Sequence, residues 1–251
     1  MNLNRFISEN ITGRTQSMFG YDINKNKLLL SNNIYSKKIV GNKLTKGFEE
    51  LKKVWKQLEE NLVLKKYLRS FFVYSMAVQT VMLVATYFGE QEINWGNEND
   101  KRFGLIVSIL VIQLVAVVGA VLTSKLSDKI GNIKTLILIN SIWMVICICA
   151  FFVTKPQEFY ITAGFVGLVM GGIQSLSRST YSKLLPETND TTSFFSFYDV
   201  AEKIGIVIGM GIFASIDQLT GSMRNAIVFL AFFFLMGVIL LVKVQKIIVK
   251  K

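Results

Sequence analysis

Apolar residues dominate the chain from residue 70 onward, in long runs that contain no charge. A helix needs roughly 20 mostly apolar residues to cross the hydrocarbon core of a bilayer, which is about 30 Å thick. Five uncharged runs approach or exceed that length, at 70–89, 103–124, 135–154, 159–177 and 225–242, and a sixth apolar stretch lies at 193–216. The pattern predicts an all-α membrane protein with six transmembrane helices, at about 70–89, 103–124, 135–154, 158–178, 193–216 and 225–242.

A different period precedes the first run. Between residues 47 and 68, apolar side chains recur every three or four positions while Glu and Lys fill the other face; they are Phe48, Leu51, Trp55, Leu58 and Leu62. This predicts an amphipathic helix along the inner membrane surface, with a soluble partner as the alternative contact. Residues 1–46 are polar and without clear periodicity, so a disordered cytoplasmic segment is expected there, and residues 246–251 form a basic cytoplasmic tail.

Composition and charge agree with a membrane location. Of 251 residues, 51% are hydrophobic and 18% are charged, and the mean hydropathy is +0.44. The net charge of +11 would suggest nucleic-acid binding in a soluble protein, but the distribution of the charges argues against that partner. If the spans alternate in direction, 23 Lys and Arg residues fall on one side and four on the other. This is the positive-inside pattern, so both termini are expected in the cytoplasm.

The chain lacks the residues that most enzymes and metal sites need. It contains no histidine, which removes the commonest metal ligand and proton shuttle and any Ser-His or Cys-His pair. Its two cysteines, Cys147 and Cys149, stand two apart on one predicted helix and therefore point in different directions. We expect no enzyme activity, no cofactor, no disulfide and no metal site.

Polar residues recur inside the predicted spans. Gln79 lies near the middle of the first, Gln113 is central in the second, and Gln174 is near the inner end of the fourth. One such residue alone most simply makes an interhelical hydrogen bond. Their recurrence from span to span indicates a polar interior, and hence a pathway for a substrate or a proton.

The fifth span contains charges as well. Asp199, Glu202 and Lys203 fall within an arc of about 100° on a helix. Starting the span after them leaves 204–216, about 20 Å of helix, which is too short to cross. Arg178, at the inner end of the preceding span, is expected at a similar depth. Two interpretations stay open: a charged inner gate or substrate or proton site, and a self-neutralised structural cluster at the interface.

Small residues mark expected helix contacts. The fourth span contains Gly164, Gly167, Gly171 and Gly172, and the fifth contains Gly205 and Gly209. Glycines let two backbones approach closely, and packing of this kind drives helix association in lipid. We therefore expect structural packing at these positions.

The connection between the second and third spans, residues 119–138, contains a motif. Its core reads Leu-Ser-Asp-Lys-Ile-Gly at 126–131, followed by Lys134. It resembles the signature inner loop of the major facilitator superfamily, Gly-x-Leu-Ala-Asp-Arg/Lys-x-Gly-Arg-Lys, with Ser124 at the leading Gly position and Asn132-Ile133 in place of most of the basic pair. The resemblance implies a gating latch formed by Asp128, Lys129, Gly131 and Lys134.

Longer stretches extend the resemblance. The segments at 166–187 ("VGLVMGGIQSLSRSTYSKLLPE"), at 194–205 ("FFSFYDVAEKIG") and "IDQLTGSMRNAI" look like the major facilitator branch related to the autophagy-linked vacuolar amino-acid effluxers and their bacterial members. The segments "KGFEELKKVWKQ", "VQTVMLVATYFG" and "LIVSILVIQLVAVVGA" resemble the same branch in the same order. The resemblance covers about residues 45–245, which correspond to the central cytoplasmic segment and the second six helices of a twelve-helix transporter.

This resemblance implies a secondary active transporter of small organic solutes, with amino acids as one possible class, in a bacterial inner (plasma) membrane. Superfamily transporters hold substrate between two halves, so one half supplies only part of a cavity. The expected partners are the bilayer, the solute, and a separate six-helix N-terminal half or a second copy of the chain. The alternative is a truncated, non-transporting membrane remnant or scaffold.

Overall fold

The computed structural model describes residues 47, 49, 52–58, 61–186 and 191–250. These residues form helices joined by turns and short loops, and none of them lies in a strand. The chain divides into two compact units, 1–53 and 54–251. The expectations for 1–46, and those for Phe48 and Leu51, lie outside the described residues, so the fold described below is that of the second unit.

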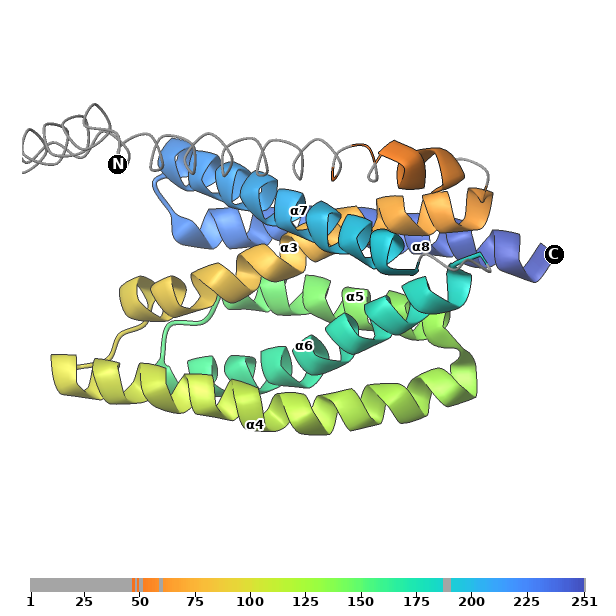
Figure 1. Cartoon of the computed structure of the whole chain (residues 1–251). Coiled ribbons are helices and arrows are strands. Elements are labelled where there is room, and N and C mark those ends of the chain that lie inside the picture. Colours follow the sequence, from red (N-terminus) through yellow and green to blue (C-terminus); the bar gives the residue numbers. More distant parts are fainter. Residues whose placement is uncertain (1–46, 48, 50–51, 59–60, 187–190, 251) are drawn as a thin grey trace, which may run out of the picture. The chain divides into compact units, whose positions relative to one another are not determined.

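Six long helices account for most of this unit (Figure 1). They are α3 (Leu62–Glu92), α4 (Glu98–Ile130), α5 (Asn132–Ala150), α6 (Pro156–Leu184), α7 (Thr191–Thr220) and α8 (Met223–Lys250). Five of them, α3, α4, α5, α6 and α8, are long and apolar enough to cross a membrane. This confirms an all-α membrane protein. The helix α7 is similarly long but carries three charges within two turns, so the count of six spans stays a prediction.

The segment before α3 is also helical, at residues 52–58. It is separated from α3 by Asn61, whose side chain accepts a hydrogen bond from the Leu64 amide at 3.1 Å and so caps the longer helix. Val54 and Leu58 are both 2% exposed, whereas Trp55 is 50% exposed and lies with its ring centroid 6.0 Å from that of Phe197 in α7. A position along the membrane surface stays a prediction.

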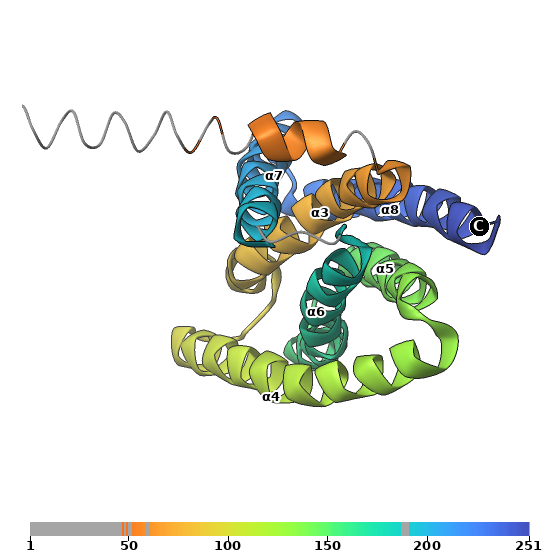
Figure 2. The same ribbon diagram turned by 45° about the vertical axis from the view of Figure 1, so that its right-hand side comes forward.

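The closest helix packing joins α4 to α6, and both views place α4 on the far side of α6 from α7 (Figures 1 and 2). A Cβ added at Gly119 of α4 would overlap the carbonyl oxygen of Leu168, and one added at Gly171 would overlap that of Ala116. A Cβ at Gly167 would lie 2.6 Å from the Ile112 carbonyl oxygen. These glycines let the two backbones touch. Apart from this contact α4 is largely exposed, with 11% of its apolar span buried.

A second group of helices, α3, α5 and α8, packs through large side chains. Trp143 of α5 is fully buried and stacks on Phe234 of α8, with ring centroids 5.6 Å apart and planes inclined by 6°. Leu136, Leu230 and Leu241 are fully buried in the same core. Burial of these large apolar side chains stabilises the packing of α3, α5 and α8 against one another.

Arg224 forms hydrogen bonds that join α3, α5 and α8 at one end of this group. The Arg224 guanidinium donates to the Glu92 carboxylate at 2.6 Å and to the carbonyl oxygens of Glu92, Phe151 and Val153 at 2.8, 2.8 and 2.6 Å. It therefore binds carbonyl groups at the C-terminal ends of α3 and α5 from the first turn of α8. Such carbonyls have no partner within their own helix, and a cation is favoured beside them.

We expect Gly171→Ala to destabilise the bundle by about 1–3 kcal/mol, because the added methyl group forces α4 and α6 apart. Gly164→Ala is the matched control on the same helix, since a Cβ there meets nothing within 4 Å. Thermal unfolding of the detergent-purified protein, followed by circular dichroism, measures both. Equal unfolding temperatures for the two variants would contradict the close α4–α6 packing.

We expect Arg224→Gln to destabilise the fold by about 2–3 kcal/mol, because it leaves the Glu92 carboxylate and several carbonyl groups without a charged donor. Arg224→Lys restores only part of this loss, since an ammonium group lacks the planar fork. Arg102→Gln, at an exposed position in α4, serves as the control. The same unfolding measurement applies. An Arg224→Gln variant as stable as the control would contradict the contribution of Arg224 to the stability of the fold.

Candidate functional site

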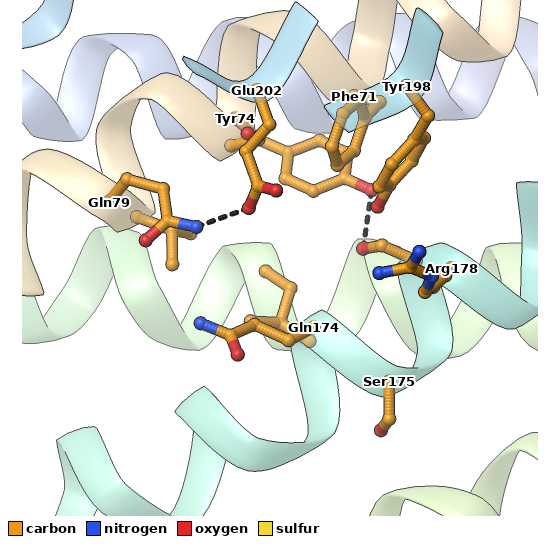
Figure 3. Close-up of a pocket in the computed structure, with 12 residues that line it drawn as sticks. Phe71, Tyr74, Gln79, Gln174, Ser175, Arg178, Tyr198 and Glu202 are labelled. Atoms are coloured by element: carbon orange, nitrogen blue, oxygen red, sulfur yellow. Dashed lines mark hydrogen bonds between the residues drawn. The ribbon is translucent and has the colours of Figure 1, made fainter. Parts of the chain in front are cut away.

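A cavity of about 280 Å³ lies between α3, α6 and α7 (Figure 3). Five residues of α3, five of α6 and two of α7 line it: Phe71, Tyr74, Ser75, Val78, Gln79, Ile173, Gln174, Ser175, Ser177, Arg178, Tyr198 and Glu202. Its walls thus combine aromatic rings, amides, hydroxyls and two charges of opposite sign. Pockets that bind small organic molecules share this mixture of apolar walls with a few polar groups.

The α3 wall follows from helical spacing. Phe71, Ser75 and Gln79 are four residues apart, so their side chains lie one above another on the same helix face. The face changes along the helix from aromatic at Phe71 to amide at Gln79. One end of the cavity is therefore aromatic on its α3 side, at Phe71, and the other end is polar, at Gln79.

At the first end, Gln79 of α3 donates a hydrogen bond from its side-chain amide to the carboxylate of Glu202 in α7. Among the described residues, no lysine or arginine pairs with this carboxylate. Glu202 is half-buried, and Figure 3 shows it beside the amide of Gln79. The cavity thus contains a carboxylate whose partner in the described part of the chain is a neutral donor.

At the other end lies the Arg178 guanidinium (Figure 3). One of its nitrogens is 3.7 Å from the Asp199 carboxylate, and the group lies over the Phe195 ring at 5.2 Å from its centroid. The two charged side chains are 56% and 48% exposed, so this ion pair contributes little to stability. A guanidinium has five N–H donors, and most of these stay available to an anionic ligand.

Aromatic rings lie at the Arg178 end of the cavity (Figure 3). Phe71 and Tyr198 stack with centroids 4.0 Å apart and planes inclined by 21°. Tyr198 also lies 4.9 Å from the Tyr181 ring, and the Tyr181 hydroxyl donates to the Phe194 carbonyl at 2.8 Å. The cluster joins α3, α6 and α7 beside the cavity.

Hydroxyl groups bond α3 to α6 behind this wall. The Tyr74 and Ser177 hydroxyls are 2.7 Å apart, and the Tyr67 hydroxyl donates to the Ser177 carbonyl at 2.7 Å. The two tyrosine oxygens are 3.4 Å apart. All three residues are buried, with Tyr67 at 0% exposure.

The structure brings together four of the seven candidate pathway residues, Gln79, Gln174, Arg178 and Glu202, in the wall of one cavity. Asp199 contacts that wall through Arg178 but does not line it. Lys203 is exposed and makes no ion pair within the described part of the chain. Gln113 is exposed on α4 and is not part of the wall.

The aromatic part of the wall, chiefly Phe71 and Tyr198, is absent from the residues that sequence reasoning singled out. The spacing of Phe71, Ser75 and Gln79 was a usable signal, because it places an aromatic ring on the face that carries the glutamine. The contact of Tyr198 with that face depends on how α7 packs on α3, which no local pattern specifies.

The inner-loop motif lies away from the cavity. Gly131, at φ +89°, joins α4 to α5 in a conformation that favours glycine. Asp128, Lys129 and Lys134 are exposed, and the Asp128 carboxylate makes no hydrogen bond or ion pair with described residues. The neighbouring Asn132 links the helices instead: it donates to the Thr180 hydroxyl at 3.2 Å and accepts from the Lys183 ammonium at 3.3 Å.

Metal-ligand clusters do not occur in the part of the chain that the structure describes: no three or more Asp, Glu or Cys side chains gather there. Cys147 is buried and Cys149 is exposed, and neither is in a disulfide. The chemistry of the cavity is therefore that of its charges, amides, hydroxyls and rings.

Comparison with known proteins points in one direction. Residues 25–248 match the family described as "Vacuole effluxer Atg22 like". The chain is 29% identical over 196 residues to the MFS-type transporter YxiO of Bacillus subtilis, covering 78% of this chain and 44% of that protein. It is 27% identical to the autophagy-related protein 22 of Yarrowia lipolytica (73% and 32% covered) and of Kluyveromyces lactis (78% and 40%). The chain thus spans less than half the length of these relatives.

Proposed function

Because this chain belongs to the Atg22-like vacuole effluxer family, a branch related to the major facilitator superfamily, we propose that it forms the second six-helix half of a secondary active transporter for small organic solutes. The observation that carries this proposal is the cavity between α3, α6 and α7, which has a carboxylate at one end and a guanidinium at the other. Opposite charges on facing walls suit a solute that carries both an anionic and a cationic group.

The cavity favours small amphoteric solutes such as amino acids. Its volume of about 280 Å³ lies just below the usual range for ligand pockets, about 300–1,000 Å³, which favours a small solute. Arg178 is suited to bind a carboxylate, since its N–H groups match the planar geometry of that group. Glu202 is suited to bind an ammonium group, and the Phe71 and Tyr198 rings beside Arg178 offer a surface for an apolar side chain (Figure 3).

A second half completes the site. Gln174, Ser175 and Arg178 are exposed on α6, a helix that is long and apolar enough to cross a membrane. Polar and charged side chains are costly at membrane depth unless protein or water covers them. The largely apolar α4 leaves further surface for such a contact. The covering chain is a six-helix N-terminal half or, as the alternative, a second copy of this chain.

Glu202 also offers a way to couple transport to an ion. A carboxylate within the membrane that lacks a basic partner must bind a proton or another cation to become neutral. Binding of the substrate ammonium and binding of a proton then compete for one group. The proposed location is a bacterial inner membrane with both termini in the cytoplasm, which is supported by the unequal distribution of basic residues.

A non-transporting membrane remnant or scaffold is the second candidate. A remnant would retain the packed core, because folding requires it, but would not need the opposed charges of the cavity.

The test is solute uptake into vesicles that contain the chain, with and without a separately supplied N-terminal half. Radiolabelled amino acids, a sugar and a dicarboxylate form the probe panel. We expect uptake of amino acids by the paired halves and little by this chain alone. No uptake of any probe in either preparation would favour the remnant.

Within the paired preparation, we expect Glu202→Gln to reduce amino-acid uptake at least about tenfold. The substitution removes the carboxylate that binds a cation, and a hydrogen bond to a charged group contributes on the order of 1.4 kcal/mol or more. Lys203→Gln is the adjacent control: it changes charge on the same helix but at an exposed position outside the cavity wall. Asp199→Asn is expected to lie between them, since Asp199 acts through Arg178. Equal uptake by the Glu202→Gln and Lys203→Gln variants, at equal expression, would contradict the assignment.

A further inference from the structure

The bundle contains two groups of helices, the α4–α6 pair and the α3–α5–α8 group. The boundary between α3 and α6 is called the seam here, and the cavity lies on it. The α4–α6 pair is held by backbone contact at glycines, and α3, α5 and α8 are held by buried rings and by Arg224. Direct packing between α3 and α6 is slight by comparison. The helix α6 meets the second group mainly through α5, so its position along α3 is set by that packing together with the polar bonds between α3 and α6.

Serine side chains in these helices usually bond to their own backbone. Ser70, Ser108, Ser141, Ser175, Ser196 and Ser215 each donate to the carbonyl one turn earlier, at 2.8–3.1 Å. Ser177 differs, because its hydroxyl pairs with Tyr74 of α3 and its carbonyl accepts from Tyr67 of α3. Both polar groups of this one residue are used across the seam.

We propose that Tyr67 is a positioning residue for the cavity: through the Ser177 carbonyl, it sets where α6 presents Arg178. Tyr67 is fully buried and does not line the cavity, so it has no direct contact with a bound solute. Arg178 is the next residue after Ser177 on the same helix turn, so a shift of that carbonyl displaces the start of the Arg178 side chain. The inference rests on the proposed function only in taking the cavity as the substrate site.

Two bonds reach Ser177, and they can be separated. Tyr74 uses the Ser177 hydroxyl, which Ser177→Ala removes, whereas Tyr67 uses the main-chain carbonyl, which that substitution leaves in place. In a Ser177→Ala background Tyr74→Phe should therefore have only a small further effect, through the 3.4 Å contact of its hydroxyl with that of Tyr67. Tyr67→Phe should keep its full effect there, since the two bonds act through different atoms.

The test measures charge selectivity at the cavity without requiring transport. Ser175→Cys, which places a thiol in the cavity wall, is the sole cysteine in a chain that also carries Cys147→Ala and Cys149→Ala. It is labelled in membranes with the anionic sulfonatoethyl methanethiosulfonate and with its cationic trimethylammonioethyl counterpart. The ratio of the two rates reports how closely the guanidinium approaches the thiol, and Arg178→Gln provides the reference for its removal.

We expect Tyr67→Phe to lower the anion-to-cation ratio by about three- to tenfold toward the Arg178→Gln value, because loss of one buried hydrogen bond changes an equilibrium by about that factor. Trp95→Phe is the control: it removes another buried side-chain donor, the indole N–H that bonds to the Gly89 carbonyl at 2.6 Å near the other end of α3. Its ratio should stay within about twofold of the parent, since that bond does not reach Ser177, Arg178 or the ring on which Arg178 lies.

An unchanged ratio in Tyr67→Phe, or an equal fall in Trp95→Phe, would overturn the proposal. If Tyr67→Phe does not accumulate in membranes, 4-fluorophenylalanine incorporated at position 67 fills a volume close to that of tyrosine without donating a hydrogen bond, and an unchanged ratio there also overturns the proposal. In the paired transporter the same variants should raise KM for the transported amino acid more than they lower the maximal rate. If the labelling ratios change as expected but no uptake is measured, the proposed function is contradicted and the positioning role of Tyr67 is not.

Discussion

Hydrocarbon offers no hydrogen-bond partner, and that constraint decides where each polar group of this bundle goes. Most serines and threonines in the helices turn back to a carbonyl of their own chain segment; Thr80 bonds to Met76 and Thr180 to Leu176. The free carbonyls at the ends of α3 and α5 are met by one guanidinium. Several of the remaining polar groups line one cavity, where Glu202 has an amide in place of a cation. Hydrogen bonds within the helices are thus distinguished from the polar groups that stay available in the cavity.

The constraint also explains how much could be predicted from the sequence. Apolar runs and glycine spacing are local, so the helices were foreseen to within several residues, and Gly167 and Gly171 lie where helices touch. The ends differ because lengths of helix continue past the hydrocarbon: α4 begins at Glu98 and α6 reaches Leu184. Residues expected at a similar depth, such as Arg178 and Glu202, could be proposed as members of one pathway. Which acidic side chain pairs with which basic one could not be predicted from the sequence.

Pairing depends on side-chain reach across three helices. Arg178 contacts Asp199, one turn nearer to the start of α7 than Lys203, and Lys203 lies outside the cavity wall. No periodicity distinguishes these outcomes, because Asp199, Glu202 and Lys203 share one arc. Similarly, the motif at 126–131 predicted a latch through Asp128, whereas the helix link in the structure is made by Asn132, a position at which the motif departs from the family pattern.

The three tryptophans give the molecule internal optical reporters. Trp143 is enclosed against Phe234, and Trp95 is bound by its indole nitrogen to the Gly89 carbonyl at 2.6 Å just beyond the end of α3. Trp55 is half exposed beside Phe197 of α7. Emission from the first two therefore records the integrity of the core and of the loop after α3, while emission from the third responds to displacement of α7. Motion of the helix that carries Glu202 can thus be followed by fluorescence without an added dye.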